Sequence, residues 1–241
     1  MDWNLIIILL VIFVATLIRA TFGFGDALFA MPILVVVTGI KTATPLMALV
    51  GFIIAITILI SERKKVKFKS ALWLIVFSLI GIPIGLFVLK GVKEELITLI
   101  LGILIVLFSS YNLLKPRLLE LKNDKLAWLF GLVAGTIGAA YNTNGPWIVI
   151  YGTLRKWNPQ NFRATLQGYF FVTGIILIIS HGIAGNFTGE VLTKYLYSLP
   201  IIFLAIFIGH RLNKRIPAGK FNNYIYLILC ILGIFLIINT F

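Results

Sequence analysis

The chain is organised as ten apolar segments separated by short polar or glycine-containing breaks. The segments cover roughly residues 4–20, 26–38, 43–60, 70–89, 95–114, 124–140, 145–155, 163–184, 190–209 and 221–240. They are runs of mostly Leu, Ile, Val, Phe and Ala without alternation at period two, so helices are expected and a β-barrel is not. Because about 20 helical residues cross a hydrocarbon core, the pattern predicts an all-α integral membrane protein.

The second and seventh segments are too short to cross a bilayer alone, reaching only about 16–20 Å at the helical rise of 1.5 Å per residue. Each follows a polar break, Thr-Phe-Gly-Phe-Gly at 21–25 and Tyr-Asn-Thr-Asn-Gly at 141–145. Short, interrupted hydrophobic segments in matching positions of two halves indicate a transporter binding site. We therefore expect two broken, re-entrant-like hairpins over residues 4–38 and 124–155.

Weak internal similarity divides the chain into two repeats. Residues 20–22 match 139–141, residues 50–52 match 167–169, and residues 101–103 match 232–234, in the same order. The predicted first repeat is 1–114, the cytoplasmic linker is 115–123, and the second repeat is 124–241. In each repeat a broken hairpin precedes three spans, at 43–60, 70–89 and 95–114 in the first and at 163–184, 190–209 and 221–240 in the second.

The basic residues predict how the chain crosses the membrane. With the loop 61–69 in the cytoplasm, sixteen of the 21 lysines and arginines fall on that side and five, including Arg19, fall outside or near the outer face. This excess follows the positive-inside rule only if each broken hairpin enters and leaves on one face. The two repeats are then inverted in a plasma membrane, with both termini outside.

Composition narrows the function further. The chain is 60% hydrophobic and 12% charged, which is far from a soluble domain. A net charge of +13 would suit a nucleic-acid partner, but the basic residues lie in short loops rather than on one face, so none is expected. The chain has one cysteine and two histidines, and no paired carboxylates stand out. We therefore expect no enzyme activity, no metal and no cofactor.

The two breaks are the candidate substrate site. If the short helices begin at the midplane, their N-termini converge and present unpaired N–H groups and partial positive charge to a small anion. Pro146 suits the first turn of the second short helix. The predicted binding residues are Gly23, Phe24, Gly25, Asp26, Tyr141, Asn142, Thr143, Asn144, Gly145 and Pro146, with Gln167 and Arg163 from the eighth segment.

Several of these residues allow a second interpretation. Asp26 either couples protons to anion movement or caps its helix, and Asn144 likewise suits an ordinary cap. Arg19 is either the partner of Asp26 or a charge that attracts the anion. Arg163 either lines an entry from the cytoplasm or extends to the membrane interface.

The motifs around the breaks are similar to those of a known family. Residues 23–32, Gly-Phe-Gly-Asp-Ala-Leu-Phe-Ala-Met-Pro, resemble the first-repeat glycine motif of the TauE/SafE sulfite-exporter family. Residues 141–146, Trp-Asn-Pro at 157–159 and Phe-Arg-Ala-Thr at 162–165 resemble the second-repeat counterpart, and the pattern from Gly209 to Phe221 is also similar. The resemblance implies transport of sulfite, sulfoacetate or related anions across bacterial and archaeal plasma membranes.

The sequence departs from the family pattern at the candidate site itself. Asp26 stands where further glycines are usual, and Asn142 and Asn144 stand where glycine is common. We predict a secondary transporter that moves a small anion, sulfite or an organosulfonate, by alternating access, with protons coupled through Asp26. An anion channel using the same helix dipoles, or a membrane subunit without transport of its own, remains an alternative.

Overall fold

The computed structural model describes residues 3–114, 120–157, 159–213 and 218–238, and these residues form helices and no strand. The elements are α1 (Trp3–Phe22), α2 (Asp26–Thr38), α3 (Ile40–Glu62), the 3-10 turn η1 (Arg63–Lys65), α4 (Phe68–Gly91), α5 (Glu94–Leu114), α6 (Ala127–Tyr141), α7 (Gly145–Leu154), α8 (Pro159–Ile183), α9 (Gly189–Asn213) and α10 (Ala218–Ile238). The predicted linker residues 115–119 and the last residues of the tenth segment, 239–240, lie outside the described residues.

Each helix corresponds to one predicted apolar segment, which confirms the all-helical fold class. The largest differences are at two helix ends. α8 begins at Pro159 rather than at residue 163, because proline is well suited to the first helical turn. α9 continues to Asn213 rather than stopping at residue 209. Arg211 lies in this added turn, and its guanidinium is 4.0 Å from the ring centre of Phe207 in the preceding turn.

Five helices in the described part of the chain are long and apolar enough to cross a membrane, namely α1, α3, α4, α8 and α9. α2 and α7 have 13 and 10 residues, as the short second and seventh segments predicted. Large apolar side chains remain exposed on outward faces of the longer helices, including Phe87, Leu107, Phe203 and Ile231. Exposed apolar side chains on so many helices form the kind of surface that is expected to contact lipid.

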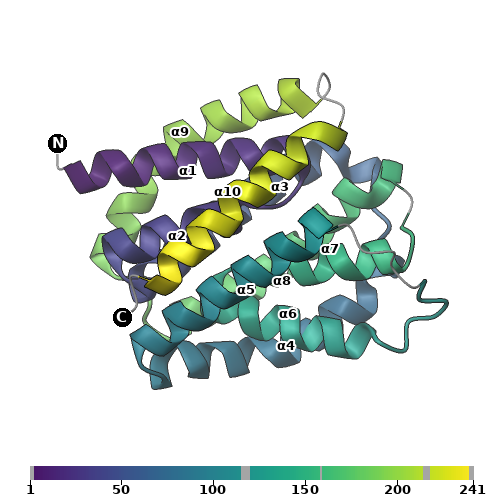
Figure 1. Ribbon diagram of the computed structural model, residues 1–241, viewed down its shortest axis with the longest axis horizontal. Coiled ribbons are helices and arrows are strands. Elements are labelled where there is room, and N and C mark those ends of the chain that lie inside the picture. Colours follow the sequence, from purple (N-terminus) through teal and green to yellow (C-terminus); the bar gives the residue numbers. More distant parts are fainter. Residues whose placement is uncertain (1–2, 115–119, 158, 214–217, 239–241) are drawn as a thin grey trace.

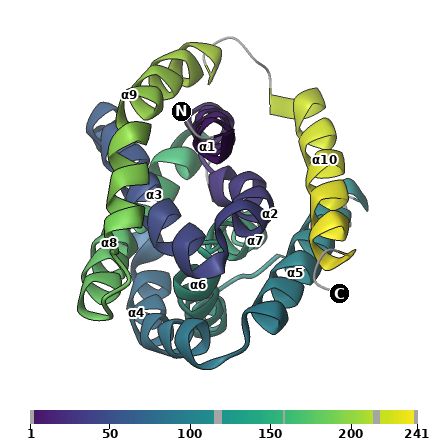
Figure 2. The ribbon, with the colours of Figure 1, turned by 90° about the vertical axis from the view of Figure 1, so that its left-hand side faces the viewer.

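The short helices lie inside the bundle. Seen along the helices, α4, α5, α8, α9 and α10 surround α1, α2 and α7 (Figure 2). The start of α1 and the end of α10 lie at the same end of the molecule, and the segment that leads into α6 lies at the opposite end (Figure 1). The two breaks in the helices are therefore held within a shell of longer helices.

Four helix pairs make most of the contacts between elements: α4 with α6, α1 with α9, α3 with α8, and α5 with α10. Glycines permit the closest approach, since a Cβ added at Gly81 of α4 would lie 2.2 Å from the carbonyl oxygen of Leu132, and one added at Gly135 of α6 would lie 2.2 Å from that of Ser78. Ser78 Oγ donates to the Gly131 carbonyl at 2.9 Å. Small residues and interhelical hydrogen bonds are the usual means of helix association in lipid.

Candidate functional site

The two helix breaks meet at one cavity between the N-termini of α2 and α7. The space open to the centre of a water-sized sphere is about 30 Å³, which is room for about two waters. Its lining comes from both halves of the chain: Arg19, Phe24, Gly25, Asp26, Ala27, Leu28, Ala48, Gly51, Phe52, Asn142, Thr143, Asn144, Gly145, Pro146, Phe170, Thr173, Gly174 and Leu177.

The first break depends on two glycines in the left-handed region. Gly23 has φ 92° and Gly25, which precedes α2, has φ 101°, a conformation that side-chain-bearing residues rarely adopt. A Cβ added at Gly23 would also lie 2.8 Å from Cγ of Arg163. The chain can therefore leave α1, turn and enter α2 within three residues only because glycine occupies these positions.

A buried ion pair spans the first break. Arg19 Nη1 lies 2.7 Å from Asp26 Oδ2, and the two side chains are only 6% and 9% exposed. The guanidinium also donates to Gln167 Oε1 at 3.3 Å and lies 4.5 Å from the ring centre of Phe170. Arg19 is thus the partner of Asp26 in the protein interior.

The second break is neutral. Asn142 ends α6 with φ 55°, and asparagine is one of the few non-glycine residues that tolerate this region. Asn144 precedes α7 without a side-chain capping hydrogen bond, and Gly25 likewise gives none to α2. The prediction that the Asn144 side chain caps α7 is therefore wrong. The first N–H groups of both short helices lack a side-chain cap from the preceding residue.

Thr143 carries an unused hydrogen-bonding group in this cavity. Its side chain is only 4% exposed, and Oγ1 has no hydrogen-bond partner among the described residues. Leaving a buried hydroxyl unpaired costs about 1–3 kcal/mol. Thr143 lies in the break before α7 and lines the cavity, so its unpaired hydroxyl is available to donate to a bound anion.

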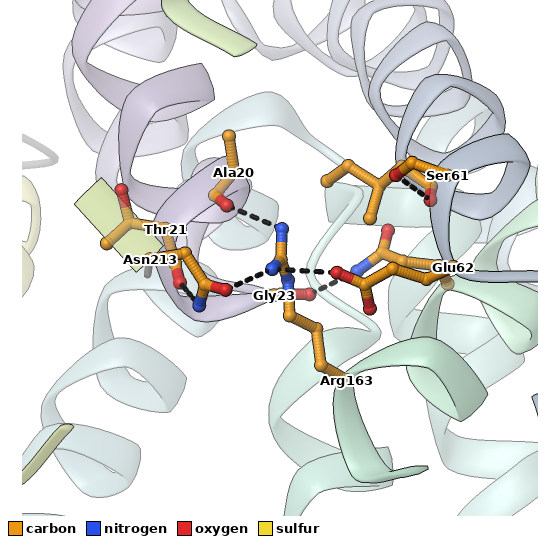
Figure 3. A network of polar contacts seen from close by, with 9 residues as sticks. Ala20, Thr21, Gly23, Ser61, Glu62, Arg163 and Asn213 are labelled. Carbon is orange, nitrogen blue, oxygen red and sulfur yellow. Dashed lines mark hydrogen bonds and ion pairs between the residues drawn. The ribbon is translucent and has the colours of Figure 1, made fainter. Parts of the chain in front are cut away.

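The C-terminal end of α1 is bonded by side chains from the second half of the chain (Figure 3). Three side chains donate to its last carbonyls: Arg163 to Ala20 at 2.6 Å, Asn213 to Thr21 at 2.5 Å and Gln167 to Gly23 at 2.6 Å. A helix C-terminus carries partial negative charge that a cation offsets. These bonds fix the position of the first break relative to α8 and α9.

Arg163 occupies the centre of this network (Figure 3). Its Nη1 lies 2.9 Å from Glu62 Oε1, with both side chains 13% exposed, and donates to Asn213 Oδ1 at 2.6 Å. The opposite charge of Glu62 compensates for burying the Arg163 guanidinium. Arg163 is therefore outside the lining of the cavity, and it joins α8 to α1, α3 and α9.

Residues 8–236 match the family model described as sulfite exporter TauE/SafE. The chain belongs to this family. Comparisons with curated proteins and with solved structures find no match. As a TauE/SafE protein it is a multi-pass membrane protein, and the family comprises transporters of sulfur anions rather than enzymes.

Eight of the twelve binding residues predicted for this TauE/SafE protein line the cavity: Phe24, Gly25, Asp26, Asn142, Thr143, Asn144, Gly145 and Pro146. The other four lie close by without lining it. The Gly23 carbonyl and Gln167 bond to each other, Arg163 packs against Gly23, and Tyr141 is buried at the end of α6.

The sequence analysis missed the contributions of α3 and α8 to the lining, notably Gly51 of α3 and Phe170, Thr173, Gly174 and Leu177 of α8. Two signals were present. Gly51 lies in the repeat match at 50–52, and the α8 residues continue from Gln167 at the spacing of three or four that defines one helix face. Among the described residues, no group of His, Cys, Asp and Glu could hold a metal ion.

Proposed function

We propose that this TauE/SafE protein is a secondary transporter that binds sulfite or an organosulfonate between the N-termini of α2 and α7. The observation that carries the proposal is the convergence, in one cavity, of two helix N-termini without side-chain caps and the unpaired Thr143 hydroxyl. Each N-terminus supplies about half a positive charge. Backbone and hydroxyl donors of this kind bind an anion through partial charges.

Asp26 and Arg19 supply a means of proton coupling. With both charged, the guanidinium is satisfied by the carboxylate at 2.7 Å. Protonation of Asp26 removes that negative charge and leaves the positive charge of Arg19, which lines the same cavity, for the anion. One proton and one anionic charge then occupy the site together, as cotransport requires.

The coupling role has a direct test. Asp26→Asn keeps the size of the side chain but carries no titratable group, so flux in this variant should no longer respond to an imposed pH gradient. The measurement is uptake into proteoliposomes with and without the gradient. Unaltered acceleration by the gradient in Asp26→Asn would exclude Asp26 as the coupling group.

The packing supports two inverted repeats, with α1–α5 equivalent to α6–α10. A two-fold axis in the membrane plane would relate the α4–α6 contact to an α9–α1 contact, and both pairs pack extensively. It would also place equivalent helices against each other, as in the α3–α8 and α5–α10 pairs. The boundaries that follow are 1–114 and 124–241, joined by residues 115–123.

A pair of glycines supports the same axis. Gly102 of α5 and Gly233 of α10 lie in one of the sequence matches between the halves. A Cβ added at Gly102 would lie 3.0 Å from the carbonyl oxygen of Gly233, and a Cβ added at Gly233 would lie 3.1 Å from that of Gly102. Reciprocal contacts between equivalent residues are what a two-fold axis at their interface produces.

Alternating access is the mechanism that this architecture suits, by rocking one repeat against the other around the site. The Arg163 network joins α8 and α9 to α1 and α3, and so bridges the two repeats. We propose that it closes the cytoplasmic side, on which the basic loop 61–69 lies, and that both termini are outside a plasma membrane. Glu62 and Arg163 would separate when that side opens.

The proposal is tested by flux of radiolabelled sulfite, sulfate, thiosulfate and sulfoacetate into proteoliposomes of the purified protein. Saturable uptake of a sulfur anion is expected, faster with an inward proton gradient. Conductance too large for a carrier cycle would instead favour an anion channel. Absence of uptake by folded protein would favour a subunit without transport of its own.

A further inference from the structure

A second cavity lies between the start of α4, the turn from α7 to α8, and the segment before α6. It is much larger than the first, with about 740 Å³ open to the centre of a water-sized sphere, and the two share no lining residue. Its lining residues are Val66, Lys67, Phe68, Lys69, Asp124, Arg155, Lys156, Trp157, Asn161 and Thr165. The cavity lies where α4 and α8, two helices long and apolar enough to cross a membrane, begin, and the ends of spanning helices are where lipid meets water.

The cavity has an excess of positive charge. Four cationic side chains and one carboxylate line it. Asp124 is occupied by Arg155, whose Nε lies 2.9 Å from its Oδ1, and Lys156 is paired with Glu120. Lys67 and Lys69 form no ion pair with any described residue. Lys67 and Lys69 therefore line the cavity without a carboxylate partner among the described residues.

One wall of the cavity is rigidly built. Tyr151 donates to Asp124 Oδ1 at 2.6 Å, and Arg155 Nη1 donates to the Leu121 carbonyl at 2.6 Å. These bonds hold the Arg155 guanidinium in place while its Nη2 makes no hydrogen bond to the described residues. The adjacent Lys156 has φ 50°, an unusual backbone conformation of the kind that concentrates at functional sites.

The opposite wall combines charge with apolar surface. Phe68 lies between Lys67 and Lys69 and is 48% exposed, and Val66 and Trp157 also line the cavity. The backbone N–H of Lys67 donates to Thr165 Oγ1 at 3.2 Å, which fixes the start of α4 against α8. The cavity thus offers cations and apolar groups side by side, the surface that an amphiphile needs.

We propose that this cavity binds the phosphate headgroup of an anionic phospholipid, with Lys67, Lys69 and Arg155 around the phosphate and the acyl chains leaving past Phe68. The chemistry recognised is an oxyanion, which a free solute such as phosphate or sulfite also presents. The lipid fits better because the cavity is far larger than a four- or five-atom anion requires and has an apolar rim. Basic pockets between membrane helices bind such headgroups.

The test compares two double variants of the full-length protein that remove the same charge from the same loop. Lys67→Gln/Lys69→Gln changes two cavity residues, and Lys64→Gln/Lys65→Gln changes two residues of η1 that do not line it. Each protein is incubated with phosphatidylglycerol or phosphatidylcholine, re-purified in detergent, and analysed for bound lipid by native mass spectrometry. Melting temperatures without added lipid verify that both variants are folded.

The wild type and Lys64→Gln/Lys65→Gln should retain phosphatidylglycerol in preference to phosphatidylcholine. Lys67→Gln/Lys69→Gln should retain about 10-fold less phosphatidylglycerol. Equal loss in the two variants would mean that loop charge alone attracts the lipid and would overturn the proposal. Displacement of the lipid by millimolar phosphate or sulfite, in the wild type, would assign the cavity to a free anion and would also overturn it. Neither readout depends on transport.

Discussion

The two helix breaks each precede a short helix but are stabilised in opposite ways. The first, between α1 and α2, contains the Arg19–Asp26 ion pair and two left-handed glycines, and three of its carbonyls accept hydrogen bonds from α8 and α9. The second, between α6 and α7, has no charged residue from Tyr141 to Gly145. Its Thr143 hydroxyl has no partner among the described residues.

This difference indicates a division of roles. The first break is held by interactions that the protein makes with itself, so it supplies a fixed position and a titratable group. The second break keeps its hydrogen-bonding capacity for something other than the protein. Changes at the first break should therefore act mainly on stability and proton coupling, and changes at the second should act mainly on the bound anion.

The largest effect is expected from breaking the buried ion pair. Arg19→Met leaves Asp26 without its partner, and Asp26→Leu leaves Arg19 without its own, so each should lower stability by about 3–5 kcal/mol. The double variant Arg19→Met/Asp26→Leu should be less destabilised than either single variant, because no unpaired charge remains. Thermal unfolding in detergent measures all three, and a double variant that loses the sum of both single effects would contradict this account.

A smaller effect on stability is expected from substituting residues whose backbone is in the left-handed region. Gly23→Ala should destabilise by about 1–3 kcal/mol, since φ is 92° and the added Cβ would meet the Arg163 side chain at 2.8 Å. Asn142→Gly should change stability by no more than about 0.5 kcal/mol, because glycine adopts φ 55° freely. If thermal unfolding shows a larger loss of stability for Asn142→Gly than for Gly23→Ala, the backbone of the first break is not the more restricted of the two.

The smallest effect on stability is expected at Thr143. Thr143→Val replaces an unpaired buried hydroxyl by a methyl group of similar size, so the protein without substrate should be more stable by about 0.5–1 kcal/mol. A fall in melting temperature would mean that the hydroxyl already has a structural partner and is not reserved for a ligand.

The helices and their breaks could be predicted because their signals are local. A run of apolar residues determines a membrane helix, and the pairs Gly23 with Gly25 and Asn142 with Asn144 mark where each helix must stop. The bonds of Arg163, Gln167 and Asn213 to the end of α1 join residues more than 140 positions apart. No periodicity encodes such contacts, so Arg163 was expected among the binding residues and its bonds to the end of α1 could not be predicted.

The central claim, that a sulfur anion binds between the two helix N-termini beside Thr143, is tested most directly by the sulfite-induced rise in melting temperature. A ligand that binds only the folded state stabilises it by RT ln(1 + [L]/Kd), where [L] is the free ligand concentration. Wild type and the control Thr57→Val, whose hydroxyl bonds only to the Ile53 carbonyl of its own helix, should show the rise. Thr143→Val should require about 10-fold more sulfite for the same rise. An undiminished response in Thr143→Val would contradict the claim.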